Sequence, residues 1–383
     1  MKYGGIYIHI PFCTEKCIYC DFYSLTKHEN QIDTFVERLC KEIRLKSSII
    51  DLKWKIDTIF IGGGTPSLLE PFHIEKIIKN LDNTFNLNYL NEFTIEANPS
   101  EFNIKKMKTF NELGVNRVSF GFQSLNNEIL KFLTRWHTPE DCIRAYKNAR
   151  TAGFENINID MIYGIPNQSI LQWEKDLNHI IDLNPEHISA YSLTVEKNTP
   201  LHTYVSSNKI IMPQEKIDID MYSHTMEALN NGHYIQYEIS NYSQKGKECK
   251  HNLHYWKRDP YLAFGPSAHG YYDNKRYWNI RNLNQYIKKI DSNHLPIDDL
   301  EVLNEENIFN EMIINGLRIS EGINMSKIKS KFSKQTYKSL TSKINDWSSH
   351  IEKSNGKIKL TKKGYFIADE ITLDLMNSYI ESY

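Results

Sequence analysis

Six strand-like runs alternate with helix-like segments over the first two-thirds of this chain, and no other feature limits its fold as strongly. The runs are GGIYIHI (4–10), DTIFIGGG (57–64), EFTIEANP (92–99), RVSFGFQS (117–124), INIDMIYGIP (157–166) and HISAYSLTV (187–195). The helix-like segments between them include 31–46, 71–81, 104–113 and 170–183. Strands joined by single helices predict parallel pairing with right-handed crossovers, and therefore an α/β fold. The nearly continuous apolar character of the strands fits a sheet covered on both faces.

Polar or glycine residues stand at or just after the carboxyl end of every run. They are Cys13, 62–65, Glu96, Gln123, Asp160 and Tyr191. A ring of such ends around one mouth is typical of a barrel, whereas a doubly wound sheet would gather them at one switch point. We therefore predict a partial barrel of six strands. The doubly wound sheet stays open as an alternative, because polar residues at strand ends also mark the start of ordinary loops.

The last third of the chain has a different pattern. A helix over 216–230 and an edge strand in YIQYEIS precede an aromatic-rich segment at 251–272. Helices are then expected over 301–317, parts of 324–347 and 363–376, with a hairpin at 350–361 whose turn is Asn355–Gly356. We predict three parts: a barrel (1–240), a connecting segment (241–297) and a small winged-helix-like α+β domain (298–383).

The charges nearly cancel, with 46 Lys and Arg against 47 Asp and Glu. No global field therefore attracts the chain to nucleic acid or anionic lipid. A cluster of lysines in the tail keeps nucleic-acid binding as a disfavoured rival: Lys327, Lys329, Lys331 and Lys334. The start contains no secretion signal, and no apolar run of about 18 residues exists, so we expect a cytoplasmic protein.

Cys13, Cys17 and Cys20 follow C-x3-C-x2-C spacing, whereas the other three cysteines are scattered. Three thiolates in one short loop can hold three corners of a [4Fe–4S] cluster and leave the fourth iron open to a small molecule. A zinc site would require a fourth ligand or a water, and His9 could supply that ligand. The spacing favours iron–sulfur, and zinc remains the alternative.

With Tyr19 before the last cysteine, this loop resembles the signature of radical S-adenosylmethionine (SAM) proteins. The resemblance implies that the open iron binds SAM, which is cleaved to methionine and a 5′-deoxyadenosyl radical. It also implies a partial (β/α)6 barrel, in agreement with the strand count.

The resemblance assigns further residues to SAM. In IGGGTPS, Gly63, Gly64 and Thr65 match the segment that holds the methionine amino group. Glu96 is placed to accept hydrogen bonds from the ribose. Other positions match SAM contacts in the same way: Tyr7, Tyr19, Gln123, Arg135 and Asp160. Each could equally be a hydrogen-bonded barrel residue, and Arg135 could simply pair with Asp160.

YIHIPFC, GGGTPS, SFGFQS and IDMIYGIP together resemble the oxygen-independent coproporphyrinogen III oxidases and their relatives, the HemW-type haem chaperones. The oxidases carry a further cysteine where this chain has Phe22, and a longer segment before the cluster. Both differences argue against porphyrinogen decarboxylation, so enzyme activity stays uncertain.

KHNLHYW (250–256) contains H-N-x-x-Y-W, which resembles the haem-binding motif of the chaperones. The resemblance implies that His251 ligates haem iron while Tyr255 and Trp256 lie against the macrocycle; His254, Tyr261 and His269 are nearby in sequence. The plain alternative is that these aromatics pack between domains and that His251 is a satisfied core residue.

We therefore expect a haem chaperone with a [4Fe–4S] cluster and SAM, which delivers haem to respiratory or haem-storage proteins. A homodimer and a peripheral membrane contact are compatible with this. The alternatives are an oxygen-independent coproporphyrinogen III oxidase and a radical SAM methyltransferase that uses a second SAM.

Overall fold

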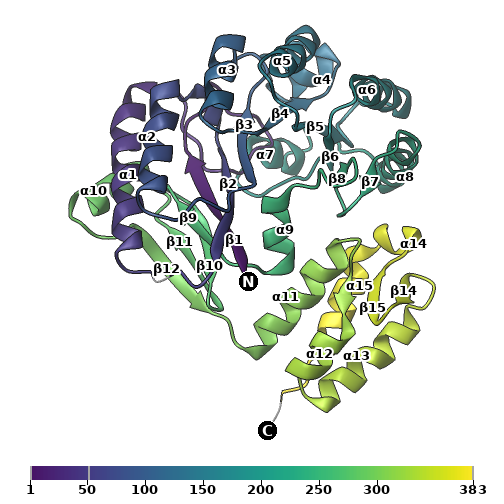
Figure 1. The fold of residues 1–383 in the computed structure, drawn as a ribbon. Helices are drawn as coiled ribbons and strands as arrows, with labels where there is room; N and C mark the ends of the chain where they lie inside the picture. The colour runs from purple at the N-terminus through teal and green to yellow at the C-terminus, as the bar shows by residue number, and fades with distance from the viewer. Residues whose placement is uncertain (1, 51, 382–383) are drawn as a thin grey trace.

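A computed structural model describes residues 2–50 and 52–381. Its main feature is a twelve-stranded sheet in the order β12-β11-β10-β9-β1-β2-β3-β4-β5-β6-β8-β7 (Figure 1). The six central strands are parallel and follow the chain order: β1 (Tyr3–Ile10), β2 (Lys55–Gly63), β3 (Glu92–Ala97), β4 (Arg117–Gln123), β5 (Ile157–Tyr163) and β6 (His187–Ser192). The predicted α/β fold with its six parallel strands is therefore confirmed.

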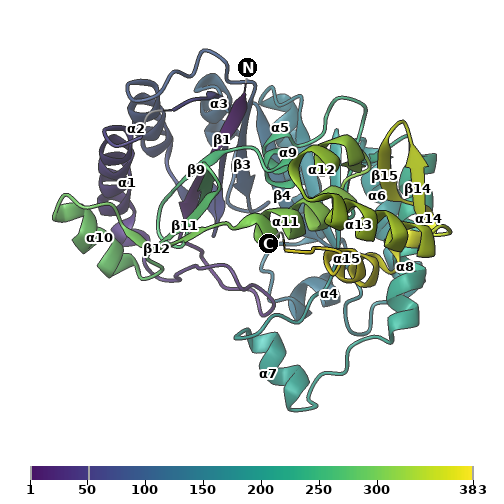
Figure 2. The ribbon, with the colours of Figure 1, turned by 90° about the horizontal axis from the view of Figure 1, so that it is seen from below.

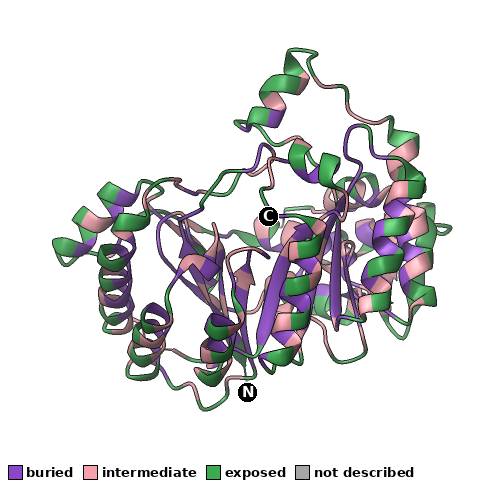
Figure 3. Ribbon diagram, turned by 90° about the horizontal axis from the view of Figure 1, so that it is seen from above, coloured by how far each residue is buried: buried purple, intermediate pink, exposed green. Residues whose placement is uncertain are grey.

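Helices cover the outer face of the central strands (Figures 1 and 3). They are α1 (Ile32–Ser47), α2 (Pro71–Asp82), α3 (Ile104–Glu112), α4 (Asn127–Phe132), α5 (Pro139–Thr151), α6 (Ile170–Leu183) and α8 (Glu215–Asn231), with 3-10 turns at Glu29–Gln31 and Pro66–Leu68. Side-chain caps define several helix starts: the Thr138 hydroxyl accepts from the Asp141 N–H, and the Asp141 carboxylate accepts from the Thr138 N–H. Helix α7 (Pro200–Ser206) projects away from the sheet (Figure 2).

The sheet extends beyond the six predicted strands on both sides. Past β6 lie β8 (Asn241–Ser243) and the edge strand β7 (Ile235–Gln236). Past β1 lie β9 (Tyr261–Phe264), which is parallel to β1, and then β10 (His269–Tyr272), β11 (Lys275–Asn279) and β12 (Ile297–Val302), each antiparallel to its neighbour. Helix α9 (Lys250–Lys257) and helix α10 (Leu283–Asp291) belong to the same region.

Two buried charged residues of α1 fasten these added strands to the barrel. The Glu42 carboxylate accepts hydrogen bonds from the Gly265 N–H at 2.8 Å and from the Asn279 amide at 2.7 Å. The Lys46 ammonium donates to the Ala263 carbonyl at 2.9 Å. These contacts join residues that are far apart in the sequence, so local sequence patterns do not predict them.

The C-terminal part has its own apolar core, built around Phe309, Ile313 and Leu340. It contains α11 (Glu305–Arg318), β13 (Ile323–Asn324), α12 (Met325–Lys331), α13 (Lys334–Asp346), β14 (Ile351–Ser354), β15 (Lys357–Leu360), α14 (Lys362–Tyr365) and α15 (Ala368–Met376). The predicted hairpin is confirmed, and Asn355 and Gly356 both have positive φ as its tight turn requires.

Two predicted helix bounds in this part were wrong. The helix expected from 301 begins at 305, because 297–302 forms an edge strand and Asn304 caps the helix that follows. The single helix expected over 363–376 is two helices that meet at 366–367. Among residues 2–50 and 52–381, no helix combines the length and apolar character that a membrane crossing requires.

Candidate functional site

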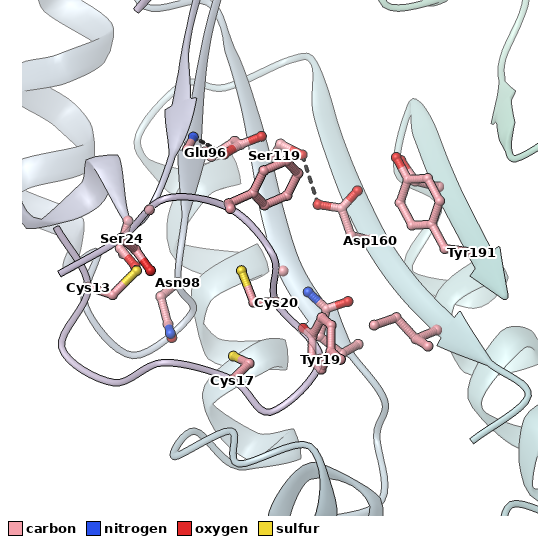
Figure 4. A pocket seen from close by; sticks show the side chains of 18 of the residues that line it. Cys13, Cys17, Tyr19, Cys20, Ser24, Glu96, Asn98, Ser119, Asp160 and Tyr191 are labelled. Atoms are coloured by element: carbon pink, nitrogen blue, oxygen red, sulfur yellow. Dashed lines mark hydrogen bonds between the residues drawn. The ribbon is translucent and has the colours of Figure 1, made fainter. Parts of the chain in front are cut away.

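A cavity of about 660 Å³ lies against the inner face of strands β1 to β6. On β4, the alternating residues Arg117, Ser119, Gly121 and Gln123 all line it, as strand geometry requires for one face. The cysteine loop borders the cavity, as do the ends of β3, β5 and β6 (Figure 4). All predicted cluster and SAM residues line this cavity, and so does Tyr255; His251 and Trp256 do not.

The cysteine loop follows β1 and is tied down at its base. The Cys13 N–H donates to the Leu25 carbonyl at 3.0 Å, and the Leu25 N–H donates to the Pro11 carbonyl at 2.7 Å. Between these anchors, the Cys20 N–H donates to the Cys17 carbonyl at 3.2 Å. Figure 4 shows the three sulfurs within one stretch of this loop.

Two of the sulfurs receive a hydrogen bond from elsewhere in the barrel. The Thr65 hydroxyl donates to the Cys13 sulfur at 3.4 Å, and the Arg135 guanidinium donates to the Cys17 sulfur at 3.3 Å. Such donors favour the thiolate. Burial works against it, because it raises the pKa of Cys13 and raises that of Cys20 to about 11. A bound cation would reverse this balance, because coordination deprotonates a thiol.

The donor set fits an iron–sulfur cluster better than a closed zinc site. His9, the candidate fourth zinc ligand, is buried, and both of its ring nitrogens are occupied. Its Nε2 bonds the Tyr23 carbonyl at 2.8 Å and its Nδ1 bonds the Tyr7 hydroxyl at 3.0 Å. Within the described ranges, no three His, Cys, Asp or Glu side chains are close enough to hold one metal ion. In the described part of the chain, the three thiols therefore have no protein group that completes a single-ion shell.

The glycine loop after β2 supports the cysteine loop directly. The Gly64 N–H donates to the Ile10 carbonyl at 2.8 Å, and the Thr65 N–H donates to the Phe12 carbonyl at 2.7 Å. A Cβ at Gly64 would lie 2.5 Å from the Phe12 carbonyl oxygen, and one at Gly63 would lie 2.5 Å from the His9 ring. Glycine is therefore required here for close packing of protein on protein, and not only for the approach of a ligand.

Two acidic residues line the cavity, Glu96 from β3 and Asp160 from β5. Glu96 accepts from the Gly63 N–H at 3.0 Å through Oε2. Asp160 accepts from Ser119 at 3.1 Å and from Asn158 at 2.8 Å. Burial, and next the charge of Asp160, raise the pKa of Glu96 to about 7, and burial raises the pKa of Asp160. Glu96 Oε1 accepts no hydrogen bond from the described residues and can therefore accept one from a polar ligand.

Gln123 and Arg135 lie at the carboxyl end of β4. The pairing of β4 with β5 shifts register between Gly121 and Gln123, where Gln123 has a positive φ of 69° and still lines the cavity. The Arg135 guanidinium donates to the Gly121 carbonyl at 2.9 Å as well as to the Cys17 sulfur. No ion pair joins Arg135 to Asp160 in the described part of the chain, and the contacts of Arg135 link the cysteine loop to β4.

The structure places His251 apart from the cavity. It is fully buried in α9, where its Nδ1 bonds the Thr58 hydroxyl and its Nε2 bonds the Tyr255 hydroxyl, both at 2.8 Å. Its ring stacks on Phe60, with ring centres 5.3 Å apart. Neither nitrogen is free to ligate iron in this conformation. The guanidinium of Arg318, at the end of α11, lies over the Trp256 ring, with its central carbon 4.7 Å from the ring centre.

Several inward-facing polar residues were missed at the sequence level: Arg117, Ser119, Asn158, His187, Ser189 and Asn252. Most stand at alternate positions of predicted strands, so a period-two reading of RVSFGFQ and HISAYS would have found them. Asn252 lies on α9, where only the structure reveals the direction of the side chain.

Comparison with known proteins agrees with this geometry. The sequence model of the Radical SAM superfamily matches residues 7–180. The fold is similar to that of coproporphyrinogen III oxidase (HemN) from Escherichia coli, with a TM-score of 0.84 and 21% identity over 99% of this chain and 91% of that chain. At that identity, the likeness concerns the fold alone.

The sequence relatives are closer. The haem chaperone HemW of Bacillus subtilis is 34% identical over 372 residues, which cover 95% of this chain and 97% of the relative. The haem chaperone HemW of Lactococcus lactis is 33% identical over 374 residues, which cover 97% and 96%. Identity at this level over nearly the whole length of both chains extends the match beyond the barrel. The chain therefore belongs to the HemW family within the radical SAM superfamily.

Proposed function

We propose that this protein is a haem chaperone that binds haem and passes it to acceptor proteins. The observation that carries the proposal is the similarity to named haem chaperones over almost the entire chain, including the C-terminal part. The cavity adds support, because it gathers three thiols and a ring of polar groups at one place.

In this proposal Cys13, Cys17 and Cys20 hold a [4Fe–4S] cluster, and SAM occupies the adjoining cavity. Cluster and SAM together supply one-electron chemistry at a sulfonium when bound. Thr65 and Arg135 stabilise two of the thiolates through their hydrogen bonds. Glu96 Oε1 is the acceptor for the ribose, and Tyr7, Tyr19 and Asp160 provide polar walls.

Anaerobic reconstitution followed by haem titration tests the proposal. The purified protein is expected to contain iron and acid-labile sulfide, to bind SAM, and to bind haem. When haem-loaded protein is mixed with an apo-cytochrome, haem should pass to the apo-cytochrome. The two proteins are then separated, and the haem in each is measured by absorbance. Zinc without labile sulfide would reject the cluster, and absence of haem uptake would reject the chaperone.

A second candidate is a radical SAM enzyme that acts on a porphyrinogen, or a methyltransferase. It is favoured by one observation: Gln123, Arg135 and Asp160, whose positions resemble contacts to a second SAM in the oxidases, all line the same cavity. Phe22, where the oxidases carry cysteine, is 61% exposed at the cavity border. Stoichiometric protoporphyrinogen formation from coproporphyrinogen and SAM would support this candidate against the chaperone.

The proposal also includes a cytoplasmic location, respiratory or haem-storage proteins as acceptors, and division of the chain near 240 and 297. Sedimentation with and without haem tests for a homodimer, and flotation with vesicles tests for membrane contact.

A further inference from the structure

The strands added beside β1 extend the inner face of the barrel beyond the cavity. On β1, Tyr7 lines the cavity, and Gly5, two residues earlier on the same face, is the partner of Tyr261 on β9. Tyr261 is opposite Tyr271 on β10, so His269, two residues before Tyr271, belongs to this inner face as well. His269 does not line the cavity. The inner face of the sheet therefore carries a histidine outside the site already described.

The His269 side chain is available to a ligand. The residue is exposed, and its imidazole forms no hydrogen bond with the described residues. Partial burial, and next the charge of Arg276, lower the pKa of His269, so its ring is neutral at pH 7. A neutral imidazole with a free nitrogen is the form that ligates iron. In this conformation His269 therefore offers iron a nitrogen, whereas both nitrogens of His251 are hydrogen-bonded.

Trp278 lies beside His269 and adds an apolar surface. The two residues are directly opposite each other on β11 and β10. Their rings are stacked, with centres 5.9 Å apart and planes inclined by 25°. Because an axial imidazole stands roughly upright on a macrocycle, a haem held by His269 would lie across the edges of both rings. Edge-to-face contact with a flat π-system is favourable for an indole. The pair therefore combines an iron ligand with a contact for the macrocycle.

Arg281 supplies a cation next to this pair. Its guanidinium lies over the Tyr23 ring, with its central carbon 5.6 Å from the ring centre, and it forms no ion pair with the described residues. The pKa of His9 is lowered to about 4, chiefly by burial and also by the charges of His269 and Arg281, so both side chains lie near His9. The Arg276 guanidinium, in contrast, is paired with glutamates of β12 and α11. Of these two arginines, Arg281 is therefore the one that can accept an anionic group.

We propose that His269, Trp278 and Arg281 form a second haem-binding site, on the inner face of β10 and β11. In this site the His269 imidazole ligates the iron, Trp278 contacts the macrocycle, and Arg281 pairs with a propionate. Asp299 is opposite Trp278 on β12, one strand further from His269, so the propionates point toward Arg281 instead. The inference rests on the proposed function, which supplies haem as the ligand. It adds an exposed position, from which an acceptor protein can take haem while His251 is hydrogen-bonded.

Titration with haemin beyond one equivalent tests the site. Wild type should show a second, weaker step in absorbance, because an exposed site covers less of the macrocycle. His269→Ala should weaken that step by at least about tenfold. Arg281→Gln should weaken it by about fivefold for haemin and leave haemin dimethyl ester unchanged. Metal-free protoporphyrin IX has no iron to ligate, so wild type and His269→Ala should bind it equally. In His251→Ala the weaker step should remain.

His350→Ala is the matched control. His350 also lies beside a tryptophan, Trp347, with ring centres 5.6 Å apart, but its Nδ1 bonds the Ser349 hydroxyl at 2.9 Å. Its replacement should leave both steps unchanged. An equal loss in His350→Ala and His269→Ala would show general binding of haemin to surface histidines and would overturn the site. A single step in wild type, or a second step that His269→Ala preserves, would also overturn it. No haem uptake by wild type would instead overturn the proposed function.

Discussion

The cysteine loop and helix α9 both border the cavity, yet they treat their ligand-type side chains differently. In the loop, Cys13 and Cys17 each accept one side-chain hydrogen bond, and Cys20 is partly exposed. In α9, His251 is fully buried and both of its ring nitrogens are hydrogen-bonded. The loop leaves its sulfurs free for coordination, whereas the helix uses its histidine to hold itself against the barrel.

The neighbouring strands explain this difference. Gly5 of β1 has no side chain, and a Cβ there would lie 2.7 Å from the His251 ring. Glu92 binds the N–H groups that begin α9, which fixes the helix in place. Ligation of haem iron by His251 would therefore require its ring to leave the Thr58 and Tyr255 hydroxyls, and the apparent haem affinity would be reduced by the population of that released conformation.

Cys17→Ala tests the role of the cysteine loop and is expected to cause the greatest loss. Removing one of three thiolates leaves two, which cannot hold the cluster, so iron, labile sulfide and the broad visible absorption should be lost. Iron and sulfide analysis after anaerobic reconstitution measures this. Cys40→Ala is the control, because Cys40 is a buried thiol of α1 outside the cavity, and it should retain the cluster. A cluster that persists in Cys17→Ala would mean that the ligands are misassigned.

His251→Ala tests the role of the α9 histidine in haem binding and in stability. It should weaken haem binding by more than about tenfold while cluster content stays the same. The free energy of unfolding should also fall by about 3 kcal/mol, because two hydroxyls lose their partner and a cavity remains. Haem titration and denaturant unfolding measure the two effects.

His73→Ala is the matched control for that loss of stability. His73 is equally buried and hydrogen-bonded, but it caps α2 away from the cavity. Its replacement should lower stability and leave haem affinity unchanged. Haem uptake by His251→Ala equal to that of wild type would remove His251 from haem binding.

The sequence allowed the six central strands and the C-terminal hairpin to be predicted because their signals are local. Apolar runs end at Gly, Pro or polar residues, and Asn355–Gly356 has the turn chemistry of a tight hairpin. The strands added beside β1 could not be predicted in the same way. Their place depends on contacts such as Glu42 with Gly265, which join residues more than 200 positions apart.

In the site, too, residues with a local sequence signal could be predicted and residues placed by long-range contacts could not. Spacing alone located Cys13, Cys17 and Cys20 in one loop, because three ligands within eight residues must be neighbours in space. The direction of His251 was beyond the sequence, because a helix can turn either face to the barrel. Arg117 escaped notice because a basic residue at a strand start usually reaches solvent, whereas here its side chain is buried and lines the cavity.

The pH dependence of stability should distinguish α9 from the cysteine loop, because His254 of α9 forms ion pairs with Asp57 and Asp259 that the cysteine loop does not share. Burial lowers the pKa of His254, but hydrogen bonds to Asp259 and Asp57 outweigh burial and raise it to about 9. The ion pairs of protonated His254 are fully formed below pH 6.5. They are lost as the pH rises through 9, which should lower the free energy of unfolding by about 3 kcal/mol.

Denaturant unfolding between pH 6 and 10 measures this loss. His254→Gln should flatten the curve over that window, since its side chain does not titrate. The visible absorption of the cluster should not follow the same curve. A wild-type slope that His254→Gln preserves would show that other groups control the pH dependence.

Thr58→Val should have the smallest effect and tests the comparison most directly. It removes the hydroxyl that holds His251 Nδ1 and keeps the imidazole, so it favours the conformation in which His251 is released. One hydrogen bond contributes about 1 kcal/mol, so haem affinity should rise by up to about fivefold, whereas cluster content should not change. Haem titration at fixed pH measures the shift, and Thr94→Val is the control, because the Thr94 hydroxyl on the neighbouring strand has no hydrogen-bond partner among the described residues. Weaker haem binding in Thr58→Val would mean that the hydrogen bond orients His251 for iron, and α9 would then bind haem without moving.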